Sequence, residues 1–208
     1  MEAWAIWAAG LFLTAGLTAE KPAMQFLSSP NWDERPADAR IQAIVIHDTN
    51  HPGIRKARTI ANHFLNPRSK VSAHYIIGKA GEIIQCVPDE KRAWHAGISR
   101  FLDREHVNDF SLGIELVNDE TGKDPFTEAQ YAALSRLLSY LIQRYQIPDA
   151  NVIGHRDVAL PLGIKQDPAD NFDWLYLWKK TRPLLPKEWP SQGAFGGGNR
   201  RVSTKQNR

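Results

Sequence analysis

Two short and almost uninterrupted apolar runs constrain the fold of this 208-residue chain more than any other feature. The first is QAIVIH at residues 42–47, and the second is SLGIELV at residues 111–117. Such runs indicate strands buried on both faces, as in sheets that helices cover on both sides. Each run carries one ionisable side chain, His47 at the end of the first and Glu115 inside the second. A buried carboxylate is costly, so Glu115 is expected to have a partner or a function.

The clearest predicted helix begins after Thr127 and ends before Pro148. Thr127 and Gln130 have the spacing of a capping box, in which each side chain bonds the backbone of the other residue. Apolar residues then recur every three or four positions: Tyr131, Leu134, Leu138, Leu141 and Tyr145. This spacing predicts one apolar stripe along a helix that can pack on a sheet.

Shorter elements fill the rest of the chain. We expect strands at 73–77, 82–87 and 151–154, and helices at 57–65 and after Asp173. Gly78 to Gly81 is typical of a hairpin turn between the first two of these strands. Strands that alternate with helices predict a single α/β domain with a central mixed sheet.

The chain begins with a hydrophobic segment, residues 1–19, in which positions 3–19 carry no charge. The length fits a secretory signal and lies at the lower edge of what could span a bilayer. Glu2 and the lack of Lys or Arg before the run are unusual for a signal. We expect export to the periplasm or cell envelope. The alternatives are an uncleaved anchor in contact with a membrane, a buried helix, and a cytoplasmic protein.

The other end, residues 191–208, contains three consecutive glycines and few apolar residues, so we expect a flexible basic tail after a domain at 20–190. The last ten residues hold four basic side chains and no acidic one, so the net charge of +3 is concentrated there. A charge this small does not indicate a nucleic-acid partner. We expect a monomer.

The chain has one cysteine, Cys86, which excludes an internal disulfide and any multi-cysteine metal site. A metal ion would therefore need histidine and carboxylate ligands. His47, His155 and Asp167 supply that composition, which suits zinc. A histidine at the end of a strand is nevertheless more often structural, and Asp167 before Pro168 could be a turn residue.

Four segments, in this order, resemble the zinc-dependent N-acetylmuramoyl-L-alanine amidase family, which includes the AmpD-type amidases and the peptidoglycan recognition proteins. The segments are IVIHDT, SAHYIIGKAGEIIQCVPDEKRAWHAG, NDFSLGIELVN and GHRDVALPLGIKQDP. The resemblance extends from about residue 41 to residue 178. It implies a central mixed sheet flanked by helices, with a metal site in a surface groove. The implied reaction is hydrolysis of the amide between N-acetylmuramic acid, or its anhydro form, and L-alanine in peptidoglycan or muropeptides.

The resemblance also implies roles for single residues. His47, His155 and Asp167 would bind one zinc ion per chain. Glu115 would act as general base and then as proton donor, and Lys165 would stabilise the oxyanion. Trp94, His95 and Asn108 lie in segments that line the substrate groove in relatives. We expect Cys86 to be a small buried apolar residue. The other histidines are expected to be structural or at the surface: His51, His63, His74 and His106.

Two segments depart from the family pattern. Residues 169–171 read ADN where many relatives have glycine and proline, and Asp48-Thr49 follows His47 at a position where relatives vary. Neither departure removes a ligand. The rival hypothesis is a binding module of the same fold that recognises peptidoglycan without cutting it. Such members typically lack a metal ligand, whereas all the candidate positions are filled here. Whether intact peptidoglycan or only soluble anhydromuropeptides are cut stays open.

Overall fold

The computed structural model describes residues 19–190. The predictions for the hydrophobic segment at 1–19, apart from Ala19, and for the tail at 191–208 lie outside the described residues. Within the described range, no helix combines the length and the apolar character that crossing a membrane requires.

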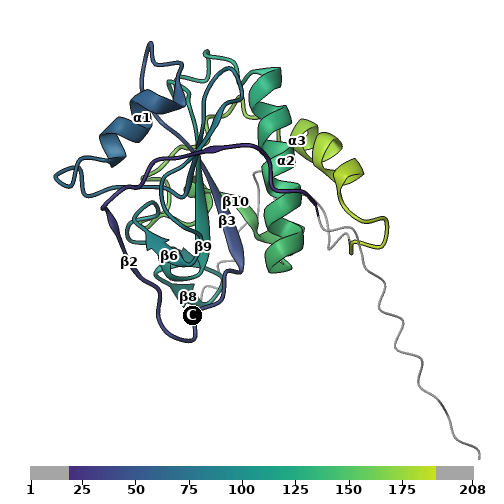
Figure 1. Cartoon of the computed structure of the whole chain (residues 1–208), viewed down its shortest axis with the longest axis horizontal. Coiled ribbons are helices and arrows are strands. Elements are labelled where there is room, and N and C mark those ends of the chain that lie inside the picture. The colour runs from purple at the N-terminus through teal and green to yellow at the C-terminus, as the bar shows by residue number, and fades with distance from the viewer. Residues whose placement is uncertain (1–18, 191–208) are drawn as a thin grey trace, which may run out of the picture.

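A six-stranded sheet forms the centre of the domain (Figure 1). Its spatial order is β1 (Gln25–Phe26), β5 (Ile83–Gln85), β4 (Tyr75–Ile77), β9 (Ser111–Leu116), β3 (Ala43–Asp48) and β10 (Val152–Gly154). Neighbouring strands run parallel except β4 and β5, which form the antiparallel hairpin predicted around Gly78 to Gly81. The sheet is therefore mixed, as expected.

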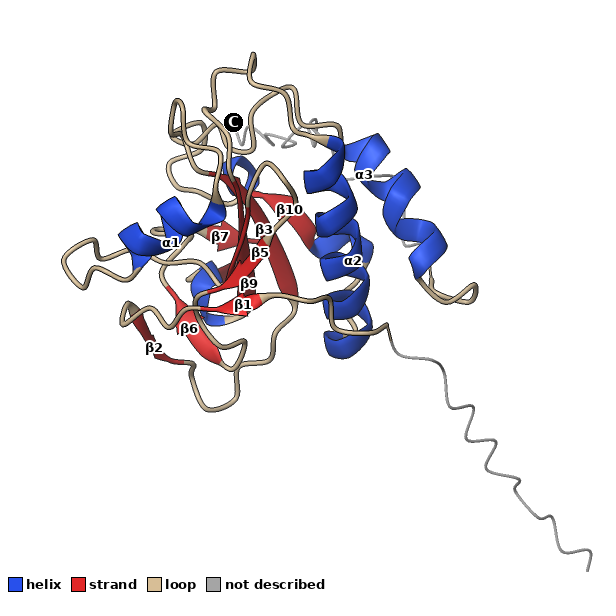
Figure 2. Ribbon diagram, turned by 45° about the horizontal axis from the view of Figure 1, so that its top comes forward, coloured by secondary structure: helices blue, strands red, loops and turns tan. Residues whose placement is uncertain are grey.

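Three helices flank the sheet, with α1 on one side and α2 and α3 on the other (Figure 2). They are α1 (Ala57–Phe64), α2 (Glu128–Tyr145) and α3 (Trp174–Thr181). The predicted capping box at the start of α2 is present, because Thr127 and Gln130 bond each other's backbone. Asp173 caps α3 through its side chain, which accepts from the Tyr176 amide at 2.9 Å.

The two faces of the sheet differ in chemistry because successive side chains of a strand point to opposite faces. Ile44 and Ile46 of β3, with Leu112, Ile114 and Leu116 of β9, pack in one apolar cluster with the buried side of α2. The alternate positions face the other way and include His47 and Glu115, together with Ser111 and Gly113. The side of the sheet opposite α2 is thus free to hold polar side chains.

Several short elements have no counterpart in the expectations from sequence. They are the antiparallel pair β2 (Trp32–Glu34) and β6 (Lys91–Ala93), the antiparallel pair β7 (Arg100–Phe101) and β8 (Arg104–Glu105), β1, and 3-10 turns at Val107–Asp109, Asp149–Asn151, His155–Asp157 and Arg182–Leu184. These elements have two or three residues each. Segments this short carry no periodic apolar pattern, so the sequence alone does not reveal them.

Candidate metal centre

The candidate site lies where the parallel strands β3, β9 and β10 end at one edge of the sheet. His47 and Glu115 are the last residues but one of β3 and β9, and His155 directly follows β10. Asp167 comes from the loop before α3, and its carbonyl accepts from the Arg156 amide at 2.9 Å. Ligands commonly bind at the carboxyl ends of the strands in parallel sheets.

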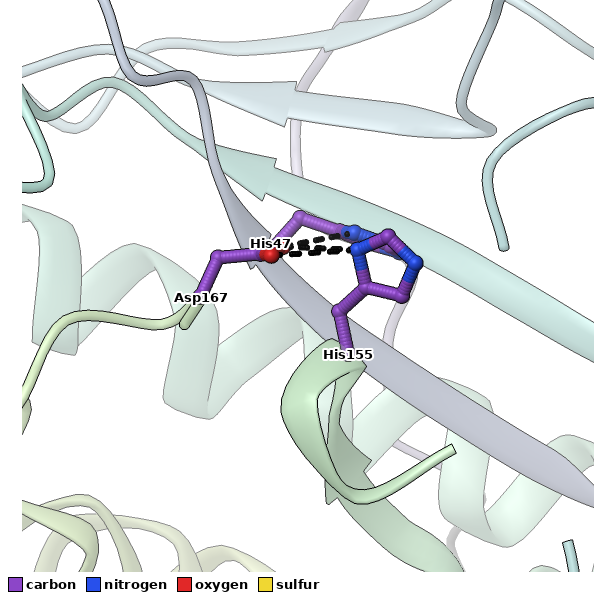
Figure 3. Close-up of side chains that lie close together, drawn as sticks. All are labelled: His47, His155 and Asp167. Carbon is purple, nitrogen blue, oxygen red and sulfur yellow. Dashed lines mark hydrogen bonds and ion pairs between the residues drawn. The ribbon is translucent and has the colours of Figure 1, made fainter. Parts of the chain in front are cut away.

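His47, His155 and Asp167 converge on one point (Figure 3). The Nδ1 atoms of both histidines lie 3.0 Å from the same carboxylate oxygen, Asp167 Oδ2. One ligand atom from each residue lies within 4.8 Å of the others, and all three side chains are buried. Two imidazoles and one carboxylate form the donor set of a hydrolytic zinc site that leaves a fourth position open.

The tautomer of His155 supports a cation at this point. Its Nε2 lies 3.4 Å from the carbonyl oxygen of Ala96, which can only accept, so Nε2 carries the hydrogen. The Nδ1 lone pair of a neutral His155 then faces the Asp167 carboxylate. Two groups that both offer lone pairs repel each other unless a positive charge lies between them, so these residues fit a metal ion.

Charge states in the site also suit a metal. Burial lowers the pKa of His47 to about 4, so the imidazole is neutral near pH 7. Burial alone would raise the pKa of Asp167, but its close contacts with the imidazoles of His155 and His47 hold it below its usual value, so the carboxyl is ionised. Neutral imidazole and ionised carboxylate are the forms that bind metals.

Glu115 stands next to His47, since the two residues are register partners on β9 and β3. Burial raises the pKa of Glu115 well above its usual value, and the negative charges of Asp167 and Asp48 raise it further. Its Oε2 atom is buried and has no hydrogen-bond partner among residues 19–190. An unpartnered carboxylate of this kind, beside a metal centre, is suited to accept and return a proton.

A cavity of about 280 Å³ opens over these side chains. Of the eight residues predicted for the site, seven line it: His47, Glu115, His155, Asp167, Lys165, Trp94 and His95. Lys165 is exposed, on the loop that carries Asp167. Trp94 is half-buried at the cavity edge, where its indole Nε1 donates to Asp33 Oδ2 at 2.7 Å.

Asn108 is the one predicted site residue that does not line the cavity. It is buried, and its Oδ1 accepts from the backbone amides of His95 at 3.2 Å and Ala96 at 2.8 Å. His95 contacts a candidate ligand directly, because its Nδ1 lies 3.1 Å from His47 Nε2. Burial and the neighbouring His47 and His74 lower the pKa of His95 well below its usual value.

The remaining histidines and the cysteine lie as expected. His74 is fully buried, and its Nδ1 accepts from the Gly113 amide at 3.0 Å while Nε2 lies 3.1 Å from the Lys91 carbonyl oxygen. Burial raises the pKa of the Cys86 thiol to about 12, so it behaves as a small apolar residue. The other three histidines are exposed, and the first two line the cavity: His51, His63 and His106.

The two departures from the family pattern contact each other. The Ala169 amide donates to Asp48 Oδ2 at 2.7 Å, which ties the loop after Asp167 to the end of β3. Burial raises the pKa of Asp48 to about 7 in spite of that bond. Neither this contact nor the position of Glu120, which lines the cavity, was predictable from the sequence. Asp48 is the last residue of β3 and Glu120 lies in the loop after β9, and nothing in their spacing singled them out.

Fold and site together define the class: a mixed α/β protein with a two-histidine, one-aspartate centre beside a half-buried glutamate. The sequence profile of the family "N-acetylmuramoyl-L-alanine amidase" matches residues 37–170. The 1,6-anhydro-N-acetylmuramyl-L-alanine amidase AmpD of Citrobacter freundii is 36% identical over 174 residues, 77% of this chain and 91% of that protein. The chain therefore belongs to the N-acetylmuramoyl-L-alanine amidase family.

Solved structures agree with this assignment and confirm the predicted fold class. The crystal structure of a selenomethionine derivative of AmpD is 34% identical, with a TM-score of 0.66, and the match covers 81% of this chain and 98% of that one. The amidase AmiD of Escherichia coli, in complex with its substrate anhydro-N-acetylmuramic acid-L-Ala-D-γ-Glu-L-Lys, is 31% identical, with a TM-score of 0.59. That match covers 71% of this chain and 60% of AmiD.

Proposed function

We propose that this protein hydrolyses the amide between anhydro-N-acetylmuramic acid and L-alanine in muropeptides, with one zinc ion per chain. The observation that carries the proposal is the convergence of His47, His155 and Asp167 beside the unpartnered Glu115 in one cavity. The names of the AmpD relatives and the substrate in the AmiD complex support the anhydromuramyl form of the substrate.

The three candidate ligands and Glu115 have separate roles in the proposed reaction. His47, His155 and Asp167 would hold the zinc ion, which, when bound, polarises the scissile carbonyl and lowers the pKa of water to about 7. Glu115 accepts the proton that the attacking water releases, and burial, which raises the pKa of Glu115, favours the protonated form of this carboxyl. Glu115 then returns the proton to the leaving nitrogen of L-alanine.

Two further residues would act on the substrate. The ammonium of Lys165 stabilises the negative charge that grows on the carbonyl oxygen, because the side chain lines the same cavity as Glu115. The indole of Trp94 offers an apolar surface at the cavity edge, where a sugar or peptide group can pack.

A peptidoglycan-binding module without catalysis is the competing function. Binding alone requires neither three convergent metal donors nor a carboxylate whose buried oxygen lacks a hydrogen-bond partner. Keeping such a carboxylate near a second one is costly, and this favours catalysis over a binding role.

The test compares the wild type with Glu115→Gln and with Glu90→Gln, a control at an exposed glutamate outside the cavity. Hydrolysis of an anhydromuramyl tripeptide is followed by release of the free peptide, and zinc content by atomic emission. We expect Glu115→Gln to keep one zinc ion and to lose roughly 100- to 10,000-fold in kcat. The proposal is wrong if the wild type holds no stoichiometric zinc or if Glu115→Gln hydrolyses the substrate normally.

A parallel digestion of intact sacculi and soluble anhydromuropeptides determines which form of the substrate the protein hydrolyses. We expect the soluble compounds to be cut faster.

We also propose that the protein acts in the periplasm or cell envelope, because residues 3–19 have the length of a signal segment. Fractionation of cells that produce the full chain, and a form that lacks residues 3–19, tests this location. Full chain in the cytoplasmic fraction would support the alternative.

A further inference from the structure

We propose that His95 is a positioning residue, which fixes the tautomer and orientation of His47. Asn108 holds the segment 95–96, whose groups hydrogen-bond the far ring nitrogens of both candidate metal-binding histidines. The inference rests on the metal centre of the proposed function. It assigns these two residues to the support of the metal site rather than to contact with substrate.

The direction of a hydrogen-bond chain fixes the tautomer. Ser111 Oγ lies 2.6 Å from the Val107 carbonyl oxygen, which can only accept, so the hydroxyl donates to it. The lone pairs of Ser111 Oγ then accept from His95 Nε2, 3.2 Å away. A neutral His95 with its hydrogen on Nε2 has a bare Nδ1 that accepts from His47 Nε2 at 3.1 Å. The lone pair of His47 is therefore on Nδ1, the atom that faces Asp167.

The sheet is shaped to hold the His95 ring in this place. A Cβ atom added at Gly113 of β9 would lie 2.5 Å from Cγ of His95 and 2.8 Å from its Nδ1. Carbon atoms do not approach this closely, so the ring packs directly on the backbone of β9, where only glycine fits. Gly113 lies on the same face of the strand as Ser111 and Glu115, between them.

Asn108 links the two histidine ligands. Its single Oδ1 atom accepts from the amides of His95 and Ala96, at 3.2 and 2.8 Å. His95 bonds His47, and the Ala96 carbonyl bonds His155 Nε2 at 3.4 Å. One buried amide oxygen thus holds the outer partners of both ligands.

The turn that carries Asn108 is itself anchored. The Arg35 guanidinium donates from Nη1 to the carbonyl oxygens of Asn108 and Asp109, both at 2.9 Å. The Val107 carbonyl oxygen, in the same turn, accepts the hydrogen bond from Ser111 Oγ. The outer partners of a metal site orient its ligands, and removing one typically lowers metal affinity about 10- to 100-fold.

The test measures zinc affinity at pH 7 by competition with a chromophoric chelator, on the full chain. His95→Phe keeps a ring but removes the acceptor, and His95→Asn returns an acceptor close to the Nδ1 position. Asn108→Leu removes the shared acceptor, and Asn108→Asp keeps it. His106→Asn is the matched control, because His106 is exposed, lies outside the cavity, and has a φ of 58°, which asparagine tolerates.

We expect His95→Phe and Asn108→Leu to bind zinc about 10- to 100-fold more weakly. His95→Asn and Asn108→Asp should recover most of the affinity, and His106→Asn should match the wild type. The visible spectrum of the cobalt-substituted protein should change in His95→Phe and return in His95→Asn, because it reports the geometry of the ligands. If His95→Phe does not fold, as judged by thermal unfolding of the metal-free protein, Ser111→Ala tests the same chain with the ring in place.

Three results would overturn the inference. The first is a His95→Phe protein that binds zinc as the wild type does, and the second is a raised KM with unchanged zinc affinity, which would make His95 a substrate contact. The third is a failure of His95→Asn to recover affinity. A wild type that binds no zinc contradicts the proposed function instead, so the two failures are distinguishable.

Discussion

His47 and Glu115 are register partners on adjacent parallel strands, β3 and β9. Both side chains therefore leave the sheet on the same face, the one opposite α2, and their backbones are separated by the spacing of neighbouring strands, about 4.8 Å. The candidate metal ligand and the proposed proton acceptor are thus held by the backbone ladder of the sheet, whereas Asp167 and Lys165 come from a loop. Relative placement of the first pair does not depend on loop motion.

Lys165→Met tests the role of the loop cation. The variant keeps the length of the side chain and removes its charge, so we expect kcat on an anhydromuramyl peptide to fall about 100-fold. Zinc affinity and thermal stability should not change, because Lys165 is exposed. Lys123→Met, at an exposed lysine outside the cavity, is the control. A change in KM alone would instead make Lys165 a substrate-binding residue.

Gly113→Ala tests the close packing of His95 on β9. The new methyl group would lie 2.5 Å from His95 Cγ, so the ring must move off the backbone of β9, which disturbs its contact with His47. We expect weaker zinc binding and a loss of stability of about 1 to 3 kcal/mol from overpacking. The stability cost should be much smaller when His95→Ala is already present, which a double-mutant cycle by denaturant unfolding measures. Equal costs in the two backgrounds would show that the methyl group meets another obstacle.

The long elements were predictable from the sequence because each carries a strong periodic or apolar signal. The run at 42–47 and the stripe after Thr127 became β3 and α2 with boundaries within one or two residues. The antiparallel pair β2 and β6 was not predictable, since each strand has only three residues, most of them charged, and the two strands lie far apart in the chain. Local composition carries no information on such contacts.

The candidate ligands were predictable as residue types at strand ends, but their convergence was not. His47 and Asp167 are 120 positions apart, and only the order of strands in the sheet brings them within 3.0 Å. The segments around His95 and Asn108 predict, by their resemblance to the family, that both residues bind substrate. Their observed bonds, to His47 Nε2 and to two backbone amides, depend on the 3-10 turn at Val107–Asp109, which has no periodic signal.

The buried imidazole of His74 should make the free energy of unfolding depend on pH. Burial lowers the pKa of His74 to about 3, and the nearby charge of Arg35 contributes to the shift. The unfolded chain binds a proton at this residue below about pH 6.5, whereas the native protein does so only below about pH 3. Stability from this residue is therefore complete above pH 6.5 and is lost as the pH falls towards 3.

The expected loss between pH 7.5 and pH 5 is about 2 kcal/mol. Urea unfolding of the metal-free wild type and of His74→Asn, at both pH values, measures it. His74→Asn is expected to be less stable overall but to lose about 2 kcal/mol less than the wild type over this interval. Parallel pH dependence in the two proteins would show that His74 is not the group responsible.

Removal of the Thr127 hydroxyl should lower the stability of the protein without changing its activity. Its hydroxyl accepts from the Gln130 amide at 3.1 Å and donates to the Lys79 carbonyl at 2.7 Å, so it caps α2 and ties the helix to the β4–β5 turn. Thr127→Ala should cost about 1 to 2 kcal/mol and lower Tm by roughly 2 to 8 °C, whereas Thr127→Ser should keep both bonds. Thr59→Ala, at an exposed position within α1, should leave Tm nearly unchanged. Because α2 packs on the sheet face opposite Glu115, Thr127→Ala should have the kcat of the wild type at temperatures below the Tm of the variant. A reduced kcat at these temperatures would show that the position of α2 is coupled to the metal centre.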